Sequence, residues 1–158
     1  FGPHRGLALA RRMALLNYRS PNELNERFER TWQSGVSPLG KGGRFAVESY
    51  LDFHGNKFTR RFDANSYITL VEAMNSHDIS RNRGSLNEAL EKITAKTLVA
   101  GITSDRLFPI EGQEKIASGI KAPLIGNTLH VIDSEYGHDG FLIEREIVGP
   151  LLTQLLES

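Results

Sequence analysis

Two stretches near the end of the chain decide its fold: Thr97-Leu-Val-Ala-Gly-Ile-Thr-Ser-Asp105 and Thr128-Leu-His-Val-Ile-Asp-Ser-Glu-Tyr-Gly-His138. Each is a short apolar run that ends in a polar turn. The first turn carries a carboxylate and the second carries an imidazole. Short continuous apolar runs are typical of strands that are covered on both faces of a sheet. The pattern therefore predicts two buried strands, over residues 98–102 and 129–132.

The segment between these runs, residues 109–119, has the pattern of a crossover helix, and a closing helix is predicted over 141–156. A strand–helix–strand unit is almost always parallel and right-handed, so both strands end at the same edge of the sheet. Ligands bind at that edge in open α/β sheets. We therefore expect Asp105 and His138 to lie within hydrogen-bond reach, ~2.6–3.2 Å, as the acid and the base of a catalytic triad.

The third member of such a triad, the nucleophile, is missing from the sequence. No Gly-x-Ser-x-Gly motif occurs, and there is no cysteine to replace the serine. Two strands alone also do not make a stable sheet of this type. The chain begins at Phe1 rather than at Met. We therefore expect it to be part of a longer protein, whose N-terminal half supplies the nucleophile and the remaining strands.

Residues 1–95 are expected to be helical, because apolar residues recur in them at helical spacing. Asp63 can cap one helix, and Ser85-Leu-Asn-Glu88 forms a capping box for another. Gly55 weakens the helix predicted around it. The predicted fold is therefore α/β, with a helical segment over 1–95 followed by a strand–helix–strand–helix segment with an incomplete sheet over 96–158.

Composition excludes several classes of function. The 158 residues include 19 basic and 19 acidic side chains, so the formal net charge is zero and no electrostatic footprint for nucleic acid is present. No apolar run approaches the ~20 residues needed to cross a bilayer, and no signal-peptide pattern opens the chain. The absence of cysteine fits a cytoplasmic protein. We therefore expect neither nucleic acid nor a membrane to be a partner.

Several motifs resemble the homoserine O-acetyltransferases of the α/β-hydrolase superfamily, and together they extend over nearly the whole chain. They are Gly6-Leu-Ala-Leu-Ala-Arg-Arg-Met-Ala14, Asn17-Tyr-Arg-Ser20, Val47-Glu-Ser-Tyr-Leu-Asp52, Arg61-Phe-Asp-Ala-Asn-Ser-Tyr67, Gly101-Ile-Thr-Ser-Asp-Arg-Leu-Phe-Pro109 and Tyr136-Gly-His-Asp-Gly-Phe-Leu-Ile143. The resemblance implies that residues 1–95 form a helical lid and that 96–158 form the C-terminal part of an α/β-hydrolase core. It also implies a cytoplasmic enzyme of methionine biosynthesis.

The resemblance further implies a ping-pong reaction, in which acetyl-CoA acylates a serine and the hydroxyl of L-homoserine then takes the acetyl group. Asp105 and His138 match the catalytic acid and base. Asp139 matches the position that binds the amino group of homoserine, and Arg11 matches the one that clamps its carboxylate. Tyr18 matches a further active-site tyrosine. No cofactor is implied beyond acetyl-CoA as co-substrate, and no metal.

Alternatives stay open at this point. A succinyl donor, a serine acceptor or a simple esterase reaction would suit the same family, and an isolated fragment could serve only for packing or dimerisation. Arg12, beside Arg11, would be the carboxylate ligand if the helical register were shifted. Three histidines lack a carboxylate or cysteine partner at metal-ligand spacing, so we expect packing or surface roles for them: His54, His77 and His130. The resemblance also implies a homodimer formed through the lid, along with small-molecule substrates.

Overall fold

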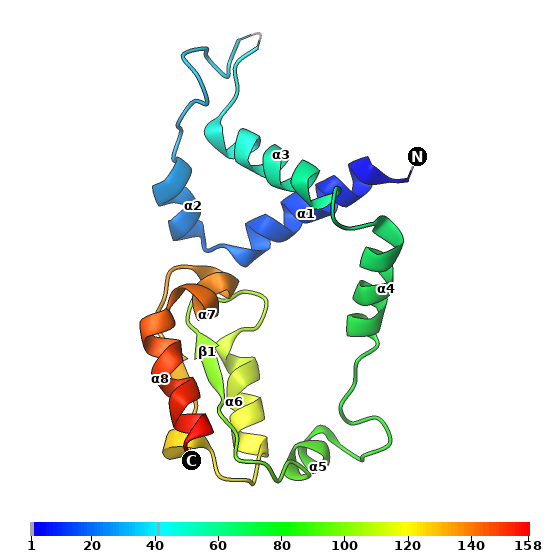
Figure 1. Cartoon of the computed structure of the whole chain (residues 1–158), viewed down its shortest axis with the longest axis vertical. Helices are drawn as coiled ribbons and strands as arrows, with labels where there is room; N and C mark the ends of the chain where they lie inside the picture. The colour runs from blue at the N-terminus through cyan, green and yellow to red at the C-terminus, as the bar shows by residue number, and fades with distance from the viewer. Residues whose placement is uncertain (1, 41) are drawn as a thin grey trace. The chain divides into compact units, whose positions relative to one another are not determined.

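The computed structural model describes residues 2–40 and 42–158, and these form two compact units. Unit 1 comprises Phe1–Asn17 and Pro21–His77, and unit 2 comprises Tyr18–Ser20 and Asp78–Ser158. Figure 1 shows that unit 1 is built from helices and that the strands lie in unit 2. The predicted division into a helical lid over 1–95 and a core segment over 96–158 stays a prediction.

Unit 1 contains α1 (His4–Tyr18, whose last residue belongs to unit 2), α2 (Pro21–Phe28), α3 (Ala46–Phe58) and α4 (Ala64–Asn75). The predicted cap of α4 is confirmed, because the Asp63 side chain accepts a hydrogen bond from the Ser66 N–H. The core of the unit is small, and its buried apolar residues are Leu7, Ala8, Leu15 and Phe28. No residue of α4 is buried.

Gly55 lies inside α3 rather than at an end of it, and packing explains why a glycine is tolerated there. It is buried against α1, and a Cβ atom at this position would lie 2.8 Å from the Ala8 carbonyl oxygen. Real Cβ atoms do not approach backbone so closely. The helix propensity lost at Gly55 is therefore offset by close contact between two helix backbones.

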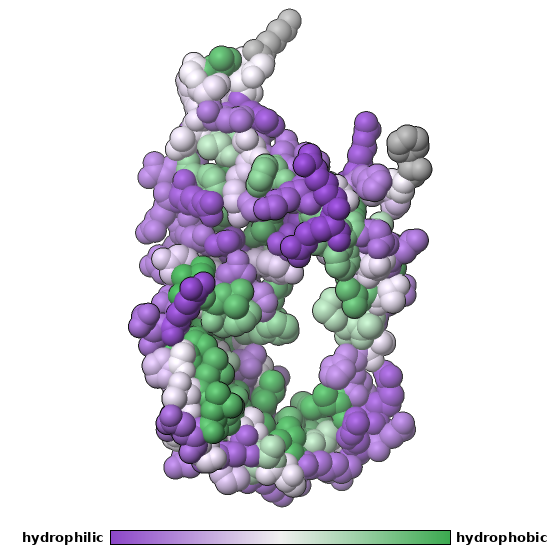
Figure 2. Space-filling model, viewed as in Figure 1, coloured by the Kyte–Doolittle hydropathy of each residue, from purple (hydrophilic) through white to green (hydrophobic). Residues whose placement is uncertain are grey.

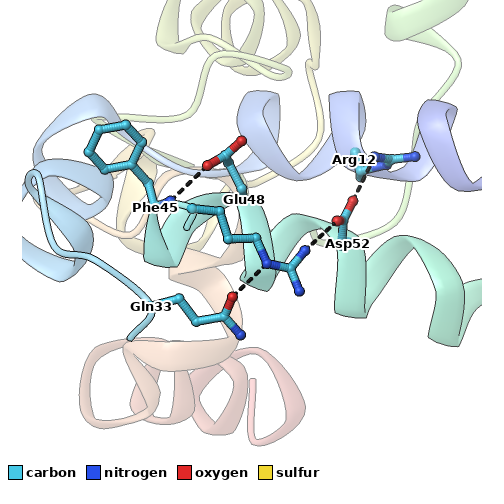
Figure 3. A network of polar contacts seen from close by, with 6 residues as sticks. Arg12, Gln33, Phe45, Glu48 and Asp52 are labelled. Atoms are coloured by element: carbon cyan, nitrogen blue, oxygen red, sulfur yellow. Dashed lines mark hydrogen bonds and ion pairs between the residues drawn. The ribbon is translucent and has the colours of Figure 1, made fainter. Parts of the chain in front are cut away.

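An ion-pair network also joins α1 to α3 (Figure 3). Asp52 accepts hydrogen bonds from Arg12 at 2.7 Å and from Arg44 at 2.9 Å. Arg44 donates in addition to the side-chain oxygen of Gln33 at 2.5 Å. The Glu48 carboxylate accepts from the backbone N–H of Phe45 at the start of α3. The acidic residues of α3 are thus all engaged within this network or at the helix N-terminus.

Unit 2 has α5 (Leu86–Glu91), β1 (Ala100–Ile102), α6 (Ile110–Gly119), β2 (His130–Ile132), α7 (Gly140–Ile143) and α8 (Arg145–Leu156), with short 3-10 turns η1 (Ile125–Asn127) and η2 (Gly137–Asp139). The strands pair in parallel, with Gly101 opposite Val131. The predicted strand–helix–strand order and its parallel pairing are confirmed, and so is the capping box of Ser85 and Glu88.

The closing helix predicted over 141–156 is wrong in one respect, because the structure divides it at Glu144. The Glu144 N–H ends α7 by donating to the Gly140 carbonyl at 2.8 Å, and its ψ of 54° turns the following peptide away from that axis. Its own carbonyl then accepts from Ile147 and Val148 and begins α8. One residue with non-helical geometry therefore separates two helices.

The core of unit 2 lies where α5 and α6 meet the start of β1, and its buried centre is Leu90, Val99 and Ile120. Other apolar side chains stay exposed, as expected for an incomplete sheet. Figure 2 shows a hydrophobic band over α8, where Ile147 and Leu152 are roughly half exposed and Leu156 more so. Within the described ranges, no helix combines the length and the apolar character that crossing a bilayer requires.

Candidate active site

Asp105 lies just after the carboxyl end of β1, and backbone N–H groups of the residues that follow hold its side chain. One carboxylate oxygen accepts from the backbone N–H of Leu107 at 2.8 Å and of Phe108 at 3.0 Å. The side chain is only 7% exposed. Burial alone would raise the pKa of Asp105, but the hydrogen bonds from Phe108, His138 and Leu107 outweigh it and hold this pKa below its usual range. Asp105 is therefore a fixed, ionised carboxylate.

His138 sits in the η2 turn that follows β2, and its Nδ1 lies 2.9 Å from the free oxygen of Asp105. The predicted hydrogen-bond reach between the two side chains is confirmed. A carboxylate can only accept, so Nδ1 is the nitrogen that donates. Nε2 then carries the lone pair in the neutral ring and can take a proton from a nucleophile. This is the acid–histidine arrangement of a catalytic triad.

Three aromatic rings surround the imidazole and limit its rotation. Their centroids lie 5.4 Å from that of His138 for Tyr18, 5.1 Å for Phe108 and 5.8 Å for Phe141. Phe108 belongs to the turn that also supplies the second N–H to Asp105. The same turn therefore orients both members of the pair. The position of Tyr18 agrees with an active-site tyrosine, whereas its role stays a prediction.

Hydroxyl groups join the loop after β1 to the loop after β2. The Ser104 hydroxyl donates to the Ser134 carbonyl at 2.5 Å and accepts from the Gly137 N–H at 2.9 Å. The Thr103 hydroxyl donates to Asp133 at 3.0 Å and accepts from the Ser134 N–H at 3.2 Å. These bonds fix the distance between the two loops, and hence between Asp105 and His138.

Gly137 has a backbone geometry that only glycine adopts without strain, with φ of +61°. A Cβ atom here would lie 2.3 Å from the Tyr18 carbonyl oxygen. The adjoining Ser20 is buried, and its hydroxyl donates to the Glu135 carbonyl. The segment from Tyr18 to Ser20 is therefore packed directly behind the histidine loop, which explains why it groups with unit 2.

Asp139 forms an ion pair with Arg19, with 3.1 Å between a guanidinium nitrogen and a carboxylate oxygen. The two side chains are 17% and 28% exposed. Sequence reasoning gave Asp139 a substrate role but missed Arg19. The signal was present, since Arg19 lies within the Asn17-Tyr-Arg-Ser20 motif beside Tyr18. Asp139 thus has a cationic partner from the chain itself.

Arg11 lies in unit 1, whereas the other predicted site residues lie in unit 2. Its guanidinium stacks over the Phe58 ring, 5.3 Å from the centroid. Arg12, the alternative if the register were shifted, is paired with Asp52 at 2.7 Å. Of the two arginines, Arg12 is thus occupied by a carboxylate of the chain.

A cavity of about 340 Å³ opens beside the Asp105–His138 pair. Strand β1, helices α6 and α7 and the two loops supply its lining, which is Ala100, Gly101, Ile102, Asp105, Phe108, Gln113, His138 and Phe141. This volume is within the range of small-molecule sites. The geometry can orient an imidazole, hold it in one tautomer and stabilise its protonated form.

Two of the other histidines have structural surroundings, and the packing or surface role expected for His77 stays a prediction. The His130 Nε2 lies 2.8 Å from the Ile125 carbonyl, and the His54 ring packs between the rings of Tyr50 and Phe53. Across residues 2–40 and 42–158, no group of three or more metal-ligating side chains lies together.

Comparison with solved structures identifies the class of fold. A homoserine O-acetyltransferase from Bacillus anthracis superposes with a TM-score of 0.83 at 23% identity, covering 98% of this chain and 42% of that one. The homoserine O-acetyltransferase from Staphylococcus aureus gives a TM-score of 0.72 at 29% identity, covering 99% of this chain and 42% of that one. Esterase E22 gives 0.77 at 20% identity, with 98% and 43% covered. The chain therefore has the fold of part of an α/β-hydrolase.

Curated sequences narrow this to a family. The homoserine O-acetyltransferase of Leifsonia xyli subsp. xyli is 68% identical over 157 residues, which are 99% of this chain and 39% of that protein. That of Thermobifida fusca is 49% identical over 155 residues, with 98% and 40% covered. No family model matches. The chain is similar to part of the homoserine O-acetyltransferases and spans about two fifths of the relatives' length.

Proposed function

We propose that this chain is the lid and the C-terminal core segment of an enzyme that transfers an acetyl group from acetyl-CoA to the hydroxyl of L-homoserine. The observation that carries the proposal is the 2.9 Å hydrogen bond between His138 Nδ1 and Asp105, made in a buried, hydrogen-bonded setting beside a cavity. Identity of 68% to a protein named homoserine O-acetyltransferase supports the choice of substrate.

The proposed reaction has two half-reactions, with a nucleophilic serine contributed by a segment outside this chain. In the first, His138 Nε2 takes the serine proton while the serine oxygen attacks the acetyl carbonyl, and the thiolate of CoA leaves with that proton. In the second, Nε2 takes the proton of the homoserine hydroxyl, whose oxygen attacks the acetyl-serine. The serine oxygen then leaves with the proton. Asp105 stabilises the imidazolium in both half-reactions.

Charge complementarity supports the assignment of homoserine to three further residues. Its carboxylate would bind Arg11, because a guanidinium can donate two parallel hydrogen bonds to a carboxylate. Its ammonium would bind Asp139, which then shares its charge between the substrate and Arg19. The hydroxyl of Tyr18 would contact the reacting end of the substrate, since the Tyr18 ring lies 5.4 Å from that of His138. The product would enter methionine biosynthesis in the cytoplasm.

The chain would need two kinds of partner to function. One is the N-terminal half of the hydrolase core, which would pair with the exposed strand and helix surfaces of unit 2. The other is a second copy, bound through the lid. Exposed apolar side chains support an interface there: Phe53, Ile68, Leu70 and Met74 are each more than half exposed.

A chimera tests the proposal. The 157 residues of the Leifsonia xyli enzyme that match this chain would be replaced by this chain, and thiol release from acetyl-CoA would be measured with and without homoserine. We expect thiol release that depends on homoserine and is abolished by His138→Ala. Substituting succinyl-CoA and serine tests the donor and the acceptor.

Three results would contradict the proposal. Thiol release that is equal with and without homoserine would indicate an esterase-type hydrolysis, for which esterase E22 shows that the fold is suitable. A preference for succinyl-CoA would reassign the donor. A folded chimera without any activity would indicate that the chain serves only for packing.

A further inference from the structure

A second cavity, of about 160 Å³, lies entirely within unit 1. Arg11 contributes to it from the middle of α1, His54, Lys57 and Phe58 from α3, and Arg61 from the turn after α3. The cavity is smaller than the 300–1,000 Å³ typical of whole small-molecule sites. It has the size of a subsite for one charged group rather than for a complete ligand.

The lining of this cavity is strongly cationic. It includes two guanidinium groups, one ammonium group and one imidazole, and no acid among the described residues lines it. Helix α1 contains no acidic residue, and α3 contains only Glu48 and Asp52. Those two carboxylates are bound elsewhere, Glu48 by the Phe45 N–H and Asp52 by two arginines. Neither helix therefore supplies an acidic side chain to the lining of the cavity.

The helix dipole explains why one of these cations is favourable at its position, but it does not explain the others. Lys57 lies in the last turn of α3, where a cation is stabilised by the helix dipole. Arg11 comes from another helix, far from an end, and its stacking on Phe58 holds the guanidinium at the cavity. Cations from two helices and a turn therefore meet at one cavity. Recognition of a multiply charged anion requires such an arrangement.

We propose that this cavity binds a phosphate group of the acyl donor, a nucleotide-containing thioester. A carboxylate carries one charge and is satisfied by one arginine, whereas a phosphate group presents three strong acceptor oxygens and up to two charges. Arg11 would then lie between the amino-acid carboxylate and the donor phosphate, with Lys57 and Arg61 dedicated to the phosphate. This inference rests on the proposed function only for the identity of the donor.

Direct binding to the chimera tests the inference without any catalysis. Calorimetric titration would compare CoA, dephospho-CoA, pantetheine, inorganic phosphate and pyrophosphate. Lys57→Gln and Arg61→Gln are the test variants. Arg60→Gln is the matched control, because Arg60 is an exposed arginine in the same turn that does not line the cavity. Thermal melts would confirm that all three variants fold like the parent chimera.

We expect Lys57→Gln and Arg61→Gln each to weaken CoA binding about tenfold, and Arg60→Gln to change it by less than about twofold. Pyrophosphate should compete with CoA, and pantetheine should not. Comparing dephospho-CoA with CoA identifies which phosphate is bound. Weaker binding of dephospho-CoA would point to the 3′-phosphate, and equal binding would point to the diphosphate.

Several results would overturn the inference. Equal effects of all three variants on CoA binding would reflect a diffuse charge field. Pantetheine binding as tightly as CoA would show that the phosphates are not recognised. Inorganic phosphate binding as tightly as CoA would assign the cavity to free phosphate instead. In the chimera, Lys57→Gln and Arg61→Gln should raise KM for acetyl-CoA but not for homoserine or for acetyl-pantetheine. An inactive chimera that still binds CoA through Lys57 and Arg61 would refute the proposed function and leave this inference standing.

Discussion

The two units differ in where their polar groups are buried. In unit 1 the buried side chains are apolar, and the ion pair of Arg12 with Asp52 remains partly exposed. In unit 2 three polar residues are buried among the described residues, namely Ser20, Asp105 and Ser134, and all three lie around the histidine loop. Buried polar groups are costly unless their hydrogen bonds are complete. Unit 2 therefore buries whole polar residues where chemistry is expected, whereas the residues of unit 1 that are buried as a whole are apolar.

The acid–histidine pair is therefore organised within one unit, and the ligand and partner surfaces of unit 1 stay proposals. Long-range hydrogen bonds between residues 103–105 and residues 133–138 fix the pair, with Asp105 as an acceptor. Helix α4 of unit 1, by contrast, buries none of its residues. Substitutions in the two units should therefore affect different quantities, and the following predictions test this from the largest expected effect to the smallest.

Asp105→Asn should produce the largest effect. The amide cannot stabilise an imidazolium and favours the wrong tautomer of His138, so kcat of the chimera should fall by about 10⁴-fold. The amide oxygen can still accept from Leu107 and Phe108, so the fold should survive. Steady-state kinetics with circular dichroism as the control would check this. A loss below about tenfold would show that Asp105 is not the catalytic acid.

Gly137→Ala should destabilise the chain by about 3 kcal/mol, because it combines a positive φ with a backbone clash at 2.3 Å. Gly149→Ala is the matched control, since Gly149 lies in α8 with open space around its Cβ position, and it should be neutral or slightly stabilising. Urea unfolding measures both. Equal effects of the two substitutions would show that the histidine loop is not constrained as described.

Asp139→Asn should weaken transfer to homoserine about ten- to hundredfold while largely sparing acylation by acetyl-CoA. The reason is that only the amino acid presents an ammonium group. Arg11→Ala in unit 1 should act in the same way on the carboxylate. Acylation and transfer followed separately by rapid mixing would decide this. Equal slowing of both steps by Asp139→Asn would reassign Asp139 to orienting the histidine loop.

Ser104→Ala should lower kcat by about tenfold with little change in KM, because it removes a bond to Ser134 and leaves the Gly137 N–H unsatisfied. Ser104→Thr keeps the hydroxyl and should restore most of the activity. If the threonine variant were as impaired as the alanine variant, the hydroxyl would not be the group that positions the loop.

The smallest effect concerns stability in acid. The lowered pKa of Asp105 means that the folded chain binds this proton less tightly than the unfolded chain does. Its contribution is therefore complete above the ordinary pKa of about 3.9 and is lost as the pH falls through the lowered folded pKa. The difference in unfolding free energy between the parent chain and Asp105→Asn should shrink below about pH 4. A difference independent of pH would contradict this.

Much of the site could be predicted from the sequence because it depends on strand order. Parallel strands bring the residues after them to one edge, and this rule alone placed Asp105 beside His138. The ion pair of Arg19 with Asp139 could not be found in this way, because its members are far apart in the chain and meet only once the segment before α2 packs behind Gly137. The break at Glu144 was missed because apolar spacing continues through it, whereas one ψ angle decides it.

The central claim is that His138, oriented by Asp105, is the general base of an acetyl-serine mechanism. The most direct test is the pre-steady-state release of thiol when the chimera is mixed with excess acetyl-CoA in the absence of homoserine. We expect a burst of one equivalent of thiol per active site, a following phase that requires homoserine, and no burst with His138→Ala. A burst of unchanged size and rate in the His138→Ala chimera would contradict this claim.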